Sequence, residues 1–165
     1  MDLQKLTTPE LIETYSNIVS LLKERKVIRT KNLLGDLAEY LVIDHYLNNP
    51  TLPNLQAAPA GTQNVDALSR KGERYSIKGT TGNLTGVFYG LNLPNSTEPE
   101  QQKFEYLIIV CFDNNYRLIK ILELTWEKFL KNKSWHKTMN AWNISVTKKL
   151  IEDCKIILAN PVKSS

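Results

Sequence analysis

The chain is poor in cysteine and histidine, with two of each in 165 residues. Cys111 and Cys154 have no cysteine at CxxC spacing, and His45 and His136 lie far from both along the chain. The sequence therefore contains no local zinc-binding motif. We interpret both cysteines as reduced, packed thiols of a cytosolic protein.

Long apolar runs are also missing. The longest, Leu107 to Phe112, is far shorter than the roughly 20 residues that span a bilayer. The N-terminus is polar and helix-forming and does not look like a secretory leader. We therefore expect a cytoplasmic protein without a membrane partner. The glycine-rich segment Lys78 to Gly82 is not a Walker A loop, because its lysine precedes the glycines.

What the composition does provide is enough apolar material for one folded domain. Hydrophobic residues make up 42% and charged residues 23%, which is ordinary for a globular protein. A chain of this length can bury a core without disulfides or structural metals, so we predict a single domain over residues 1–165. The net charge of +4 permits a polyanionic partner without requiring one.

Two helices are predicted before the first strand. Thr8-Pro9-Glu10 is a helix start, and it is followed by apolar residues at helical spacing, which predict an amphipathic helix. These residues are Leu11, Ile12, Tyr15, Ile18, Val19 and Leu22. The basic run Lys23 to Lys31 is either a solvated connection or an edge that faces phosphates. A second helix is expected over residues 32–47.

The remaining pattern predicts an α/β sandwich with a central mixed sheet flanked by helices. A hairpin is expected from two strands at 65–69 and 74–78 with a turn at 70–73, and residues 104–112 predict a strand buried on both faces. Other strands are expected near 55–58 and 116–122, an irregular segment at 79–103, and helices at 126–130 and 147–158. Trp126, Trp135 and Trp142 are expected to pack rather than to stack on bases.

The residues with the clearest chemical potential lie in the predicted hairpin. Asp66 interrupts an apolar strand, where a carboxylate is costly to bury unless something positive binds it. Lys78 ends the next strand, and Ser76 shares its face by the period of two. In a tight hairpin Asp66 lies opposite Ser76 or Ile77. The pair Asp66 and Lys78 is either a plain ion pair or part of a divalent-metal site.

The helix before the hairpin carries Asp36 and Glu39 on one face. This order of residues resembles the PD-(D/E)XK nuclease superfamily. That superfamily has a helix with a Glu, then a strand with an Asp, then a strand with (D/E)-x-K and then a buried strand. Here Glu39, Asp66 and Ser76-Ile77-Lys78 match those places. The resemblance covers about residues 30–122. Ser76 stands where the family usually has an acid, and Glu39, with Asp36 in reserve, is our candidate to replace that acid.

The resemblance implies a restriction-endonuclease-like core and metal-dependent hydrolysis of DNA, as in restriction or repair. Asp66, Glu39 and the Ile77 carbonyl would hold Mg²⁺ or Mn²⁺, and Lys78 would act at the phosphate, with Ser76 completing the catalytic motif. A homodimer is implied if both strands are cut. The alternative is an inactive nuclease-fold module that binds nucleic acid or a partner protein. Candidate DNA contacts are Lys23, Arg25, Lys26, Arg29, Lys31 and, unless it only forms a turn, Thr81.

Overall fold

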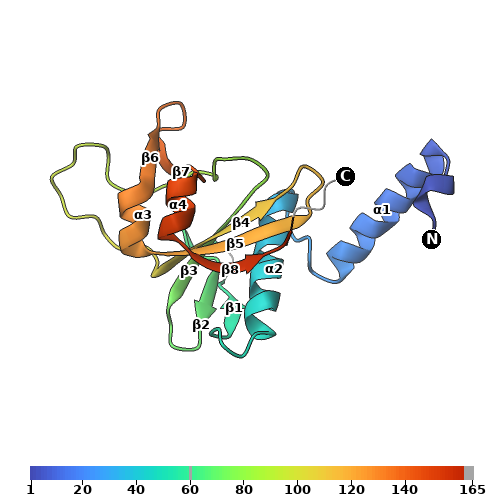
Figure 1. The fold of residues 1–165 in the computed structure, drawn as a ribbon, viewed down its shortest axis with the longest axis horizontal. Helices are drawn as coiled ribbons and strands as arrows, with labels where there is room; N and C mark the ends of the chain where they lie inside the picture. The colour runs from blue at the N-terminus through green and yellow to red at the C-terminus, as the bar shows by residue number, and fades with distance from the viewer. Residues whose placement is uncertain (60, 162–165) are drawn as a thin grey trace.

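The computed structural model describes residues 1–59 and 61–161, which form an α/β fold around a six-stranded mixed sheet (Figure 1). The strand order is β1-β2-β3-β4-β5-β8, and β6 and β7 form a separate hairpin. The helices are α1 (Thr8–Glu24), α2 (Leu33–Leu47), α3 (Trp126–Asn132) and α4 (Lys148–Asp153). The strands are β1 (Leu55–Ala57), β2 (Ala67–Ser69), β3 (Arg74–Thr80), β4 (Tyr106–Phe112), β5 (Leu118–Thr125), β6 (Lys133–His136), β7 (Ala141–Ile144) and β8 (Lys155–Ala159).

The predicted hairpin is confirmed, with β2 antiparallel to β3 and Ala67 opposite Tyr75. Gly72 in its turn has a φ of 83°, a left-handed conformation that only glycine adopts readily. Strand β3 continues well past the end of β2 and pairs in parallel with β4. All other pairs in the large sheet are antiparallel, so the sheet is mixed, as predicted.

The sheet has an apolar core on each face. Helix α2 covers one face, where its Ala38 and Val42 pack with Tyr75 and Ile77 of β3. The other face carries an aromatic cluster that joins the segment after β3 to α3. Its rings, those of Phe88, Phe104, Trp126 and Phe129, have centroids 4.8–6.0 Å apart in the contacting pairs. Strand β4 contributes to both cores, which explains its continuous apolar run.

Helix α2 begins where Asn32 caps it, because the Asn32 side chain accepts a hydrogen bond from the Gly35 N–H. It then passes very close to β3. A Cβ added at Gly79 would lie 3.0 Å from both the Ala38 Cβ and the Leu34 carbonyl oxygen. Glycine at this position therefore lets the first half of α2 approach the end of β3.

The C-terminal third differs from the prediction. The helix predicted at 147–158 ends at Asp153, and the apolar residues after it form the edge strand β8 against β5. The tryptophan-bearing segment contains a hairpin, β6–β7, which we did not predict. Trp126 is buried, and the rings of Trp135 and Trp142 pack with centroids 5.2 Å apart. The expectation that the three tryptophans pack is thus confirmed.

Helix α1 forms where it was predicted, with a capping box between Thr7 and Glu10. It does not, however, pack on the sheet. No residue from Thr8 to Glu24 is buried, and α1 extends away from the rest of the fold (Figure 1). The chain enters the body only after α1, at the buried residues Val27 and Ile28. None of the helices in the described part of the chain has the length and apolarity required to cross a membrane.

We predict that Gly79→Ala destabilises the protein by about 1–3 kcal/mol, because the added methyl group forces α2 away from β3. Gly82→Ala is the matched control, since no atom lies within 4 Å of a Cβ at that position, and it should change stability by no more than about 1 kcal/mol. Urea unfolding of both variants measures the difference. Equal stability of the two variants would contradict the close approach of α2 and β3.

Candidate functional site

Asp66 lies one residue before β2 and is held by the hairpin. Its N–H donates to the carbonyl of Tyr75 at 2.8 Å, the residue that lies opposite the neighbouring Ala67 in the hairpin. The Asp66 Oδ2 atom accepts a hydrogen bond from the Ile77 N–H at 2.7 Å. Because the N–H and C=O of one strand residue point to the same side, the Ile77 carbonyl faces the same open edge of β3.

A cleft lies at this edge, between the start of α2 and the loop after β3. Glu39, Asp66 and Lys78 all line it, so the three residues expected to converge do converge. The backbone of Ile77 and the exposed Thr81 line it as well. Glu39 comes from α2, which covers one face of the sheet, whereas the Lys78 side chain leaves β3 on the other face. Both line the cleft beside the part of β3 that extends beyond β2.

Arg29 closes one side of the site, because its guanidinium forms an ion pair with the Glu39 carboxylate. The backbone before α2 fixes the position of this arginine. The Asp36 Oδ2 atom accepts hydrogen bonds from the N–H groups of Arg29 and Thr30, at 2.8 and 2.6 Å. Asp36 is therefore a buried structural acceptor and does not line the cleft, which rules it out as the reserve carboxylate in this conformation.

The two carboxyl groups of the cleft both favour protonation. Burial raises the pKa of Asp66, and this outweighs the Ile77 N–H and the charge of Lys78, which lower it. Burial also raises the pKa of Glu39, and the nearby Asp66 charge adds to the shift in spite of Arg29. Carboxyl groups whose pKa is raised by burial and by a neighbouring charge are more frequent at functional sites than elsewhere.

Ser76 and Lys78 leave the opposite face of β3 from Tyr75 and Ile77. Lys78 is half-buried, and its Nζ atom lies 5.0 Å from the centroid of the Phe88 ring. Ser76 is fully buried and is not among the residues that line the cleft. Its hydroxyl lies close enough to favour the charged form of Asp66, but it makes no hydrogen bond within the described residues.

The donor set of the cleft suits a small, hard cation. Two carboxylates and the Ile77 carbonyl are oxygen ligands, the kind that Mg²⁺ and Mn²⁺ prefer. No group of three or more His, Cys, Asp or Glu side chains that could hold a metal occurs within residues 1–59 and 61–161. The protein would thus supply few ligands, and water or substrate oxygens would complete the coordination, as is usual for Mg²⁺.

The basic residues proposed as DNA contacts lie on one side of the site. A shallow depression lined by Lys23, Lys26, Arg29 and Lys31 lies just outside the Arg29–Glu39 pair, and Arg25 is exposed beside it. The lysines of α3, and Lys133 at the start of β6, are occupied by other contacts. Lys128 and Lys131 bind the backbone and side chain of Asp153, and Lys133 pairs with Glu100.

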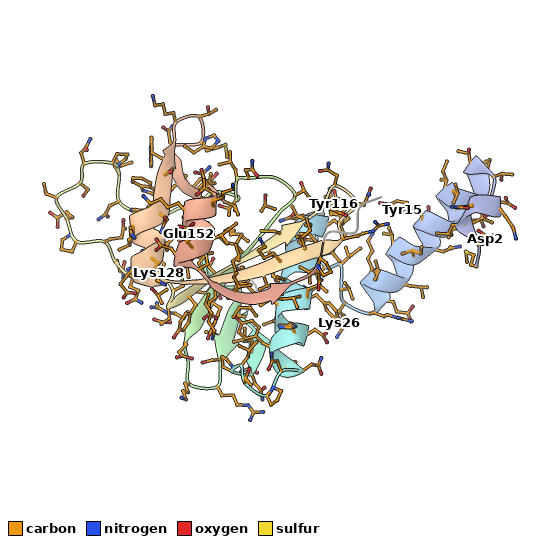
Figure 2. The ribbon with its side chains drawn as sticks, in the orientation of Figure 1. Asp2, Tyr15, Lys26, Tyr116, Lys128 and Glu152 are labelled. Atoms are coloured by element: carbon orange, nitrogen blue, oxygen red, sulfur yellow. The ribbon has the colours of Figure 1, made fainter. Side chains whose placement is uncertain are left out.

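Figure 2 places Lys128 and Lys26 at opposite ends of the body. The lysines on α3 therefore lie on another side of the body from the basic run after α1. His45 is half-buried on α2 and does not line the cleft.

No known protein-family model and no curated protein matches this chain.

We predict that Asp66→Asn stabilises the folded protein at neutral pH. Burial raises the pKa of Asp66, so the folded chain holds this proton more tightly than the unfolded chain, and the charged carboxylate lowers stability above that pKa. The side-chain amide of the new asparagine keeps an oxygen that can accept the hydrogen bond from the Ile77 N–H. The unfolding midpoint at pH 7 should rise by about 2–4 °C, as for about 1 kcal/mol in a chain of this length.

The gain should shrink as the pH is lowered toward about 4, the ordinary range of a carboxyl group. Glu13→Gln, which removes an exposed carboxylate on α1, is the control and should show no such pH dependence. Thermal unfolding followed by circular dichroism over this pH range is the measurement. A variant less stable than the wild type at pH 7 would show that the Asp66 charge is satisfied in the folded state.

Proposed function

We propose that this chain is a metal-dependent DNA endonuclease with a restriction-endonuclease-like core. The observation that carries the proposal is that Glu39 of α2, Asp66 just before β2 and Lys78 of β3 line one cleft, in the chain order of the PD-(D/E)XK motif. The exposed basic residues beside the cleft supply the charge needed to hold a phosphate backbone.

The protein groups have distinct tasks in this proposal. The Ile77 N–H fixes Asp66, and Lys78, which lines the cleft, would orient the attacking water and stabilise charge on the phosphate. In hydrolysis the water oxygen bonds to phosphorus, the bond to one bridging oxygen breaks, and that oxygen takes up a proton. When bound by Asp66, Glu39 and the Ile77 carbonyl, Mg²⁺ or Mn²⁺ would polarise the phosphate and acidify a water.

Glu39 would replace the acidic residue that the family usually has at the position of Ser76. Its carboxylate lines the cleft, and the nearby charge of Asp66 helps to raise the pKa of Glu39, as expected of two carboxylates close enough to share a cation. Ser76 itself is buried beneath the cleft, so its proposed contribution is limited to supporting Asp66.

The second candidate function is a module that binds nucleic acid without cutting it. Arg29 already neutralises Glu39, and an arginine that satisfies a carboxylate removes much of its attraction for a metal. Under this alternative Lys78 and Arg29 both face phosphates, and the cleft serves binding alone.

We predict that Lys78→Ala lowers cleavage of DNA in Mg²⁺ or Mn²⁺ by at least about 100-fold, while affinity for DNA changes by less than about threefold, since one lysine among several adds little to binding. Nicking of supercoiled plasmid measures cleavage, and fluorescence anisotropy with a labelled duplex measures binding. Lys71→Ala is the matched control, because Lys71 is exposed in the β2–β3 turn.

Glu39→Gln should abolish metal-dependent cleavage and leave the circular dichroism spectrum unchanged. If the wild-type protein binds DNA but cleaves no plasmid, linear or single-stranded substrate with either metal, the binding module is the correct function.

A further inference from the structure

Helix α1 carries an apolar stripe, Leu11, Tyr15, Ile18 and Leu22, that is not buried against the rest of the described chain. Leu11, Tyr15 and Ile18 are between 40% and 64% exposed, and Leu22 near the end of the helix is half-buried. Figure 2 shows Tyr15 on α1, well away from the sheet. Exposed single apolar residues are ordinary, but a continuous stripe of them marks an interaction surface. An isolated helix of this length is also marginal in water and depends on packing of its apolar face.

The stripe has the spacing of a helix–helix seam. Leu11, Tyr15, Ile18 and Leu22 are separated by four, three and four positions, the alternation of a heptad seam. This pattern reads the same in both directions about its midpoint between residues 16 and 17. In an antiparallel pair of α1 helices Leu11 would therefore lie opposite Leu22, and Tyr15 opposite Ile18.

The charges of α1 favour the antiparallel direction. Its first turns carry Glu10 and Glu13, while Lys23, Arg25 and Lys26 lie at its end, accompanied by one acid, Glu24. An antiparallel pair brings the acidic end of each helix to the basic end of the other, whereas a parallel pair brings like charges together. The helix dipoles act in the same sense.

The attachment of α1 to the body favours the same direction. The folded body adjoins only the C-terminal end of α1 (Figure 1). Two antiparallel helices therefore carry their bodies at opposite ends of the pair, whereas two parallel helices carry them side by side at one end. A two-fold pair of this kind is closed and self-complementary.

We propose that α1 is a dimerisation helix, and that its apolar stripe pairs antiparallel with α1 of a second copy of this chain. The pairing depends on α1 alone and is independent of the proposed nuclease activity. It gives a definite interface to the homodimer that the sequence only suggested.

We predict that the full chain forms a dimer of about twice its 18.9 kDa mass at about 100 μM, and that Ile18→Glu weakens dimerisation by at least about tenfold. Asn17→Glu adds the same charge at an exposed position next to the seam and is the matched control, which should retain the dimer. Light scattering coupled to size exclusion measures mass. Because α1 packs on nothing else, Ile18→Glu should keep the wild-type unfolding midpoint when both are measured as monomers.

The direction of pairing is tested by cysteine cross-linking under mild oxidation. Leu11→Cys mixed with Leu22→Cys should give covalent heterodimers, and either variant alone should give no more cross-linked product than the wild type. A wild-type chain that stays monomeric, equal weakening by both glutamate variants, or cross-linking of Leu11→Cys with itself would overturn the proposal. Binding of monomeric chains to anionic phospholipid vesicles, lost in Ile18→Glu, would overturn it in favour of a membrane surface.

Discussion

The hydrogen bond from the Ile77 N–H to the Asp66 carboxylate forms where β2 has ended and β3 continues with only β4 beside it. A strand edge left unpaired exposes donors and acceptors, and here the Asp66 side chain takes the place of the missing backbone partner. It thereby holds a carboxylate at the mouth of the cleft. Glu39 and Lys78 can contribute to the same cleft only because this edge is open.

In this arrangement the carboxylates of Asp66 and Glu39 have too little positive charge near them to offset their burial. Burial raises the pKa of both Asp66 and Glu39, and Arg29 compensates from outside by pairing with Glu39. The arginine is itself held through Asp36, which fixes the backbone of residues 29 and 30. In our proposal a divalent cation takes over this compensation in the working site, and Arg29 is then free to bind a phosphate of the substrate.

Features specified by local sequence were predicted well, whereas features that depend on distant partners were not. The apolar spacing of residues 34–42, the turn at Gly72 and the apolar run of β4 each determine their own element, so α2, the hairpin and the buried strand were expected. The apolar residues of β8 fit a helix or a strand equally, and pairing with β5 decides between them. Likewise, the apolar stripe of α1 predicts a helix but does not say what covers that helix. The Arg29–Glu39 ion pair joins two residues that only the fold brings close together.

The nuclease function stays a prediction, because the family motif at Ser76 is incomplete.

The central claim is that the cleft binds a divalent cation through Asp66. Calorimetric titration of Mn²⁺ into the wild-type chain and into Asp66→Ala, each confirmed as folded by circular dichroism, tests it without relying on cleavage of any substrate. We expect saturable binding with one ion per chain for the wild type and at least about tenfold weaker binding for the variant, since it loses one of two carboxylate ligands. Equal binding by both proteins, or no binding by the wild type, would contradict the account.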